Sequence, residues 1–147
     1  MPYLLDTNVI SRIANPGDAQ HSAARDAVKT LLAQGESLYI TPQNLIEFRV
    51  IATRPTNANG LGWSMSDAEA WTAKFEAMFG MLAENGLIFL HWKTLMNVTG
   101  TIGKPAHDGR LAAVAHVYGV PNILTFNVKD FRRYIIHGVT PVDPSSI

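Results

Sequence analysis

The chain has 147 residues, of which 47% are hydrophobic and 16% charged, and its twelve basic residues balance its twelve acidic ones. This composition predicts one globular domain over residues 1–147, excludes a disordered chain, and argues mildly against a nucleic-acid binder. The absence of cysteine excludes disulfides and cysteine-based zinc sites. Without a bilayer-spanning run or a signal-like N-terminus, we expect a cytoplasmic protein with no membrane contact.

Short apolar strands alternate with amphipathic helices, beginning with the strand "PYLLD" and a short helix. Pro42 is expected in the first turn of a later helix, and Ser66 is expected to cap another, with Glu69 completing a capping box. Strands are predicted at residues 2–6, 37–41, 87–90 and 122–126, with a fifth at 138–142. Further helices are predicted at 19–35, 42–54, 66–85, 91–102 and 106–119. This alternation predicts an α/β fold with helices on both faces of a mainly parallel sheet of four to five strands.

An aspartate, Asp6, interrupts the apolar start of the chain at the junction between the first strand and the first helix. Asp, Thr and Asn all cap helices well, but a cap needs only one of Asp6, Thr7 and Asn8. Functional sites of parallel sheets form beyond the carboxyl ends of the strands. Thr125 and Asn127 follow the fourth predicted strand in the equivalent place, so both strand ends are candidates for one site.

Two further acids lie on the apolar side of predicted helices, where an unpaired charge is costly. Glu47 precedes Ile51 by four residues, and Asp108 has the same relation to the apolar residues of its helix. Arg49 and Arg110 are each two residues away from these acids, a spacing that points off the shared face. Two carboxylates about 4 Å apart repel by roughly 4 kcal/mol at a dielectric of 20. If the acids converge, they need either a proton or a hard divalent cation such as Mg²⁺ or Mn²⁺.

Four segments, "YLLDTNVIS", "NLIEFRVIATRP", "HDGRLAAVAHVYG" and "ILTFNVKDF", occur in an order and spacing that resemble the PIN-domain nucleases. The resemblance is strongest to toxin subunits of bacterial VapBC-type toxin–antitoxin modules, and it covers residues 3–143. It implies a PIN-like three-layer α/β/α sandwich and Mg²⁺- or Mn²⁺-dependent hydrolysis of single-stranded RNA. It also implies a homodimeric toxin that a small antitoxin neutralises.

The resemblance assigns the family's catalytic and metal positions to Asp6, Glu47 and Asp108. It gives Thr7 and Asn8 the role of orienting Asp6 or a metal-bound water, and Thr125 that of supporting the cluster. Asn127 stands where many relatives have aspartate. Its amide oxygen can still ligate a metal but brings no charge, which puts a tightly held second ion in doubt. Asp130 is expected either to supply that charge or to cap the short helix after it.

Other readings stay open at this stage. "His107-Asp108" echoes HD-type metal phosphohydrolases, which are all-helical and give Glu47 no role, and HAD-type phosphatases need an acid where Asn8 stands. A PIN-like module that binds RNA or protein without turnover is a further alternative, favoured by Asn127. The tryptophans are expected either to stack on bases or, as is usual in amphipathic helices, to lie in the core or an interface. They are Trp63, Trp71 and Trp92.

Overall fold

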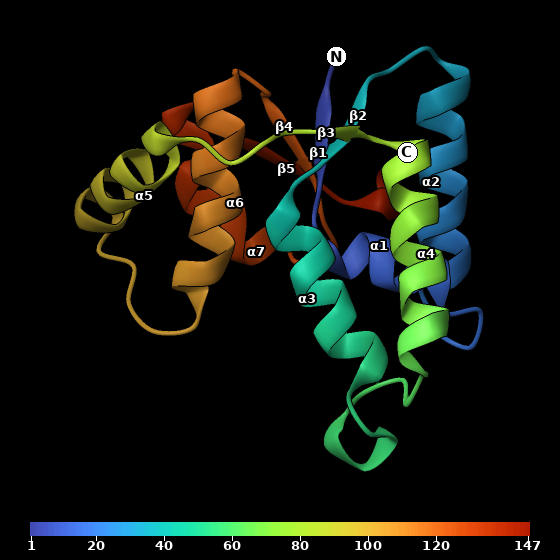
Figure 1. The fold of residues 1–147 in the computed structure, drawn as a ribbon. Helices are drawn as coiled ribbons and strands as arrows, with labels where there is room; N and C mark the ends of the chain where they lie inside the picture. Colours follow the sequence, from blue (N-terminus) through green and yellow to red (C-terminus); the bar gives the residue numbers. More distant parts are fainter.

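The computed structural model describes residues 1–147 and contains a five-stranded sheet between two layers of helices (Figure 1). The strand order is β3-β2-β1-β4-β5, and every neighbouring pair is parallel. The strands are β1 (Tyr3–Leu5), β2 (Leu38–Ile40), β3 (Gly80–Met81), β4 (Asn122–Leu124) and β5 (Thr140–Val142). The predicted α/β class and α/β/α layering are confirmed, and the parallel sheet rules out the all-helical HD-type fold.

Seven α-helices and three 3₁₀ turns connect the strands. The helices are α1 (Thr7–Ala14), α2 (His21–Ala33), α3 (Pro42–Thr53), α4 (Met65–Met78), α5 (Gly86–Thr99), α6 (Pro105–Tyr118) and α7 (Val128–Phe131). The 3₁₀ turns are η1 (Thr56–Ala58), η2 (Arg132–His137) and η3 (Pro144–Ser146). None of the helices combines the length and the apolar character needed to cross a membrane.

Alternating side chains of the central strands build a separate core on each face of the sheet. In β1, Leu5 contributes to the core beneath α1 to α4, whereas Leu4 contributes to the core beneath α5 to α7. In β4, Leu124 and Ile123 divide in the same way. Because successive strand residues point to opposite faces, the last two residues of each strand are apolar and fully buried. Figure 1 shows the two helical layers on either side of the sheet.

The predicted strand at residues 87–90 is wrong, because "LIFL" lies in the first turn and a half of α5. The side chain of Asn85 accepts a hydrogen bond from the backbone N–H of Leu87 and so caps the helix. Only Ile88 of this run is buried, and Phe89 is 62% exposed. A four-residue apolar run cannot by itself distinguish a strand from a helix. The third strand is instead the two-residue β3, which precedes the run.

The helix predicted at residues 66–85 is shorter and begins earlier than expected. Ser64, rather than Ser66, is the N-cap, and its hydroxyl accepts from the backbone N–H of Asp67. The capping box predicted with Glu69 is therefore not formed. The helix ends at Met78 because Phe79 is already extended and leads into β3. Apolar residues continue at helical spacing past Met78, so the sequence pattern predicted a longer helix than the one observed.

α6 lies close to η2 and α5 at Gly109, next to the acidic residue Asp108. A Cβ atom at Gly109 would come within 2.7 Å of the buried Tyr134 hydroxyl and would also meet the side chain of Met96. Tyr134 is fully buried, so its ring has little freedom to move away. The absence of a side chain at position 109 therefore lets this part of α6 sit against the core.

We expect Gly109→Ala to lower the free energy of unfolding by about 1–3 kcal/mol, because an added methyl group overpacks this contact. Urea denaturation followed by circular dichroism measures the change. Gly86→Ala is the matched control, since a Cβ at position 86 meets no atom within 4 Å. Equal stabilities of the two variants would show that α6 has room to shift.

Candidate active site

The carboxyl ends of β1 and β4 bring Asp6 and Thr125 together. Leu5 and Leu124 are register partners in the parallel pair, so the residue after each strand lies at the same edge of the sheet. The backbone N–H of Asp6 donates to the carbonyl of Leu124 at 2.9 Å. The Thr125 hydroxyl donates to Asp6 Oδ2 at 2.7 Å. The juxtaposition expected from the two strand ends is therefore present.

Asp6 is a buried N-cap whose carboxylate accepts several hydrogen bonds. Its Oδ1 accepts from the backbone N–H of Thr7 at 2.7 Å, and its Oδ2 accepts from Asn8 Nδ2 at 3.1 Å. Its side chain is only 5% exposed. Burial raises the pKa of Asp6 to about 6, and the charge of Glu47 adds to this effect although the hydrogen bonds to Thr125 and Thr7 oppose it. Capping the helix thus does not remove the cost of the buried charge.

Thr7 connects Asp6 to α3. Its hydroxyl donates to Glu47 Oε1 at 3.0 Å and accepts from Asn44 Nδ2 at 3.1 Å. Asn44 is fully buried and also forms the capping box of α3 with Thr41. Sequence reasoning missed Asn44, although its position three residues after Thr41 and two after Pro42 marks it as a capping residue. Burial raises the pKa of Glu47, and the charge of Asp108 contributes.

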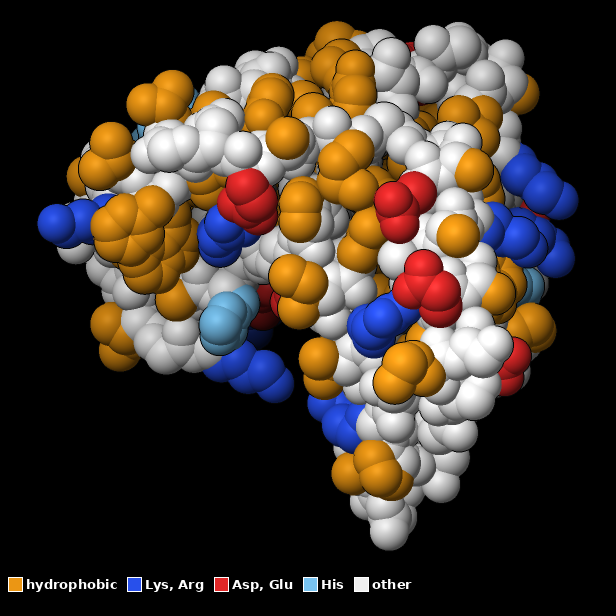
Figure 2. All heavy atoms as spheres, viewed as in Figure 1, with side chains coloured by type: hydrophobic (Ala, Val, Ile, Leu, Met, Phe, Trp, Pro, Cys, Tyr) orange, Lys and Arg blue, Asp and Glu red, His pale blue; other side chains and the backbone are white.

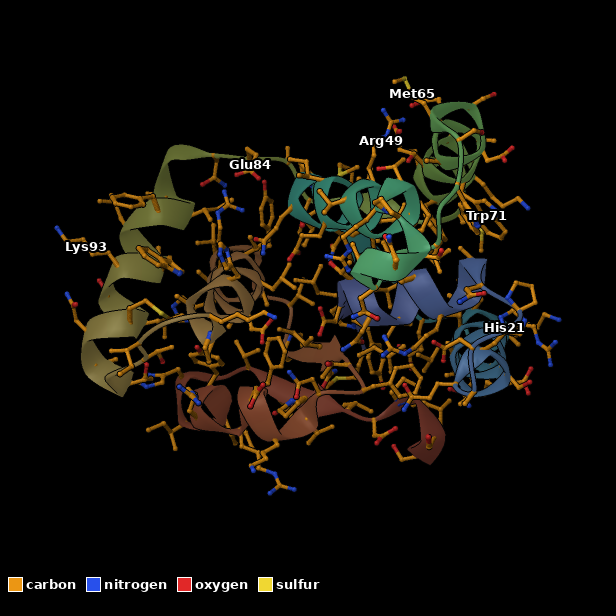
Figure 3. All side chains as sticks on the ribbon, turned by 90° about the horizontal axis from the view of Figure 1, so that it is seen from below. His21, Arg49, Met65, Trp71, Glu84 and Lys93 are labelled. Carbon is orange, nitrogen blue, oxygen red and sulfur yellow. The ribbon has the colours of Figure 1, made fainter.

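Asp108 lies in the first turn of α6 and has no basic partner. Burial is the main reason that the pKa of Asp108 is raised to about 6, and the negative charges of Asp6 and Asp130 raise it further. Arg49 pairs with Glu69 and Arg110 with Glu84, so neither arginine neutralises the nearby acids. In Figure 3, Arg49 lies on the α4 side of α3 and Glu84 between α3 and α5. The sequence prediction that these arginines do not pair with Glu47 and Asp108 is confirmed.

A cavity of about 400 Å³ opens beside these acids. Figure 2 shows a hollow between α6 and α3, with acidic side chains inside it and basic and histidine side chains on its α6 side. Asp6 does not line the cavity, but its charge interacts with those of Glu47 and Asp108. Sequence reasoning missed Lys104 and considered His107 only in the HD-type alternative. Lys104 is the N-cap of α6 and His107 lies in its first turn, and this proximity to Asp108 is the signal that points to them. The cavity is lined by Glu47, Lys104, Pro105, His107, Asp108, Asn127 and Asp130.

Asn127 and Asp130 form one unit at the β4 side of the cavity. The backbone N–H of Asn127 donates to the Thr125 hydroxyl at 2.9 Å, and its side-chain amide donates to Asp130 Oδ2 at 2.7 Å. Asp130 thus adds a fourth carboxylate to the cavity lining. It accepts a hydrogen bond from Asn127, the residue that stands where many relatives have aspartate. Asp130 lies within α7, and no side chain caps η2, the helix that follows it, so the alternative capping role for Asp130 is not seen.

The oxygen-rich donor set of this region fits a hard divalent cation. No three Asp, Glu, His or Cys side chains are close enough to one another to hold a metal ion as they stand. Glu47, Asp108 and Asn127 are only partly buried, so their side chains keep rotational freedom at the cavity. Their oxygen atoms are the ligands that Mg²⁺ and Mn²⁺ prefer. A cation would offset the burial and the repulsion that together raise the pKa values of Asp6 and Asp108.

Comparison with known sequences gives the family. The sequence profile described as "PIN domain" matches residues 3–135. The chain belongs to the PIN-domain family. No curated protein sequence matches it.

Solved structures share this PIN fold along almost the whole chain. A chain of VapBC-1 from nontypeable Haemophilus influenzae is 20% identical, with a TM-score of 0.73 and 99% of each chain covered. A chain of a toxin–antitoxin complex from Klebsiella pneumoniae is 21% identical, with a TM-score of 0.65 and 97% of each chain covered. VapC20 from Mycobacterium tuberculosis, a sarcin–ricin loop cleaving toxin, is 20% identical, with a TM-score of 0.60 over 82% of this chain and 86% of that one.

Without added metal, the PIN domain is expected to lose stability as the pH rises from about 4 to about 7. The folded chain keeps a proton on Asp6 up to a pH of about 6, whereas the unfolded chain releases it near 3.8. The unfolded state therefore binds fewer protons in this window, and ionising the buried carboxyl costs on the order of 1–3 kcal/mol. Urea unfolding in EDTA at several pH values measures the slope.

Asp6→Asn is the variant that isolates this slope, because asparagine keeps the shape of the side chain without its charge. We expect its stability to vary less with pH than that of the parent chain, with the largest gain at neutral pH. Parallel pH profiles for the two chains would show that Asp6 does not titrate as its burial requires.

Proposed function

We propose that this PIN domain is a Mg²⁺- or Mn²⁺-dependent endoribonuclease and the toxin of a toxin–antitoxin pair. The observation that carries the proposal is a cluster of unneutralised carboxylates at the carboxyl edge of the sheet. Asp6, Glu47, Asp108 and Asp130 have no lysine or arginine within ion-pair distance, whereas four acids elsewhere in the chain pair with an arginine. Those four are Asp18, Asp26, Glu69 and Glu84. Such a cluster is costly unless a cation completes it.

In this proposal Asp6, Glu47 and Asp108 hold the cation, and Asn127 contributes its amide oxygen. A bound divalent ion supplies charge neutralisation at the scissile phosphate and makes a coordinated water more acidic. Thr125, Thr7 and Asn8 are positioning residues, because their hydrogen bonds fix the carboxylate of Asp6. Fixed carboxylates hold an ion without losing further side-chain freedom when it binds.

The cavity rim suits a phosphodiester substrate. Lys104 and His107 line it, and the first turn of α6 presents the positive end of its helix dipole there. These groups attract the phosphates on either side of the cleaved bond, whereas the acids alone would repel them. The fold shared with VapC20, which is described as cleaving the sarcin–ricin loop, supports RNA as the substrate class.

Large apolar side chains on α3 and α5 support a protein partner for the proposed toxin. Ile46 and Val50 of α3 and Leu87 and Leu90 of α5 are each more than half exposed. The structural likeness to a toxin–antitoxin complex supports a small antitoxin as one partner. A second copy of the chain is the other partner in this proposal, as a homodimeric toxin.

Cleavage of RNA is expected to require Mg²⁺ or Mn²⁺ and to fall by at least about 100-fold in Asp108→Asn and Asp6→Asn, because each substitution removes a charge that holds the ion. Gel analysis of RNA from cells that express each variant, together with sequencing of the new RNA ends, measures the loss.

Asp26→Asn is the matched control, because Asp26 is exposed on α2 and pairs with Arg25, far from the cavity residues. It should cleave as the parent does. Full activity of both site variants, or cleavage that continues in EDTA, would overturn the metal-nuclease proposal. Glu47→Gln is expected to reduce activity as well, because Glu47 lines the cavity.

Replacing Asn127 with aspartate is expected to destabilise the metal-free chain by about 1–3 kcal/mol. The substitution replaces the amide that donates to Asp130 by a second carboxylate facing it. Added Mn²⁺ should recover more stability in Asn127→Asp than in the parent, since the variant offers the ion one more charge. Thermal unfolding across a Mn²⁺ titration measures both effects, and a variant that gains no more from Mn²⁺ than the parent would contradict a ligand role for position 127.

A PIN module that binds RNA without cleaving it is the second candidate. Asn127 in place of an acid, and the separation of the acids noted above, favour it. This function would be established instead if the chain bound RNA tightly in saturating Mn²⁺ without cleaving it. The Asp108→Asn variant should then bind RNA equally well.

A further inference from the structure

A second, apolar pocket of about 270 Å³ lies beside the acidic cavity. Phe89 and Trp92 come from α5, and the remaining lining residues come from the first two turns of α6. Figure 2 shows hydrophobic side chains gathered over α5, next to basic and histidine side chains over α6. The lining residues are Phe89, Trp92, Ala106, His107 and Arg110.

The α5 wall of this pocket is a pair of stacked aromatic rings. The ring centroids of Phe89 and Trp92 are 5.8 Å apart, and their planes differ by 27°. Trp92 Nε1 donates to the carbonyl of Ala106 at 2.8 Å, which fixes the indole against α6 and uses its only polar atom. The wall therefore offers a ligand flat apolar surface and no hydrogen bond, which suits an aromatic ring.

The pocket adjoins the acidic cavity at His107 of α6. Pro105 and Asp108 line the cavity, Ala106 and Arg110 line the aromatic pocket, and His107 lines both. The guanidinium of Arg110 is held by Gln43 and Glu84, so a cationic plane is fixed at the pocket. A ligand that places an anionic group in the acidic cavity and a ring in the aromatic pocket spans only the first two turns of α6.

We propose that this aromatic pocket binds one nucleobase of single-stranded RNA next to the phosphate that enters the acidic cavity, a subsite that rests on the proposed function. Single-stranded nucleic acid alternates phosphates with flat bases, and such chains are commonly held by stacking on aromatic side chains beside cationic groups. Stacking tolerates every base, so the subsite holds a nucleotide in place without selecting its identity.

The other tryptophans do not provide such a surface at the cavity. Trp63 packs edge-on against the core residue Phe48, and Trp71 packs against Phe75. Figure 3 places Trp71 at the side of the molecule opposite to Lys93 and α5. Of the tryptophans considered from the sequence, Trp92 is thus the one whose position suits base stacking.

The test measures binding of a fluorescein-labelled, unstructured RNA of mixed sequence in Ca²⁺ by fluorescence anisotropy. Phe89→Ala is the variant, because Phe89 is exposed and its loss leaves the core intact. We expect the dissociation constant to rise about 5- to 100-fold, the range that corresponds to losing one stacked base. Phe89→Tyr should restore binding, because it restores the ring.

Val98→Ala is the matched control, since Val98 is 62% exposed on the same helix but does not line the pocket. RNAs carrying a single abasic nucleotide at each position in turn identify the stacked base. At one position of the RNA, removing the base should weaken binding to the parent chain. The same abasic RNA should bind Phe89→Ala about as well as the intact RNA does.

Unchanged binding by Phe89→Ala, or the same loss in Val98→Ala, would overturn the subsite. The subsite would also be overturned if Phe89→Ala changed the oligomeric state, measured by light scattering, and left RNA binding unaltered. In that case α5 would be an interface between copies of the chain. This test measures RNA binding and does not depend on cleavage. If the parent chain failed to cleave RNA in Mg²⁺ or Mn²⁺, the nuclease proposal would be refuted, and the binding data alone would decide whether the subsite exists.

Discussion

The structure depends on an electrostatic constraint, the concentration of negative charge at the carboxyl edge of a buried parallel sheet. Asp6 follows the central strand, and Glu47 and Asp108 approach it from helices on opposite sides of the cavity. Burial opposes ionisation of each acid, and their mutual repulsion adds to that cost. Stability alone would favour apolar or paired side chains here, so the arrangement supports the proposal that the acids share a cation.

The surrounding hydrogen bonds orient the acids without neutralising them. Thr125, Asn8 and the backbone of Thr7 all donate to Asp6, which lowers the cost of its charge but leaves its pKa raised. Thr7 in turn donates to Glu47 and is held by Asn44. Helix capping and site geometry are therefore the same interactions. Asp6 caps α1, and the two roles that its sequence context suggested do not exclude each other.

Some of this site was predictable from the sequence because strand ends and helix faces are set by local patterns. The order of strands and helices placed Asp6 and Thr125 at one edge, and the apolar neighbours of Glu47 and Asp108 turned both inward. The strand assignment at 87–90 failed because a short apolar run carries no period, and only the cap at Asn85 decides it. Spacing from Thr41 marks Asn44 as a capping residue, but its contact with Thr7 depends on tertiary packing, which residue spacing does not encode. The same holds for the contact between Asn127 and Asp130.

The helical assignment of residues 87–90 also changes what these residues can do. As a buried strand, "LIFL" would have placed Phe89 in the core of the sheet. As the start of α5, it leaves Ile88 in the core and turns Phe89 outward beside Trp92. α5 packs along α6, whose first turns also carry Asp108, so the aromatic surface is fixed relative to the acids by helix packing rather than by a loop. In the proposed nuclease, a substrate chain that reaches both hollows would be aligned before any bond is broken, and that alignment would lower the entropic cost of the reaction.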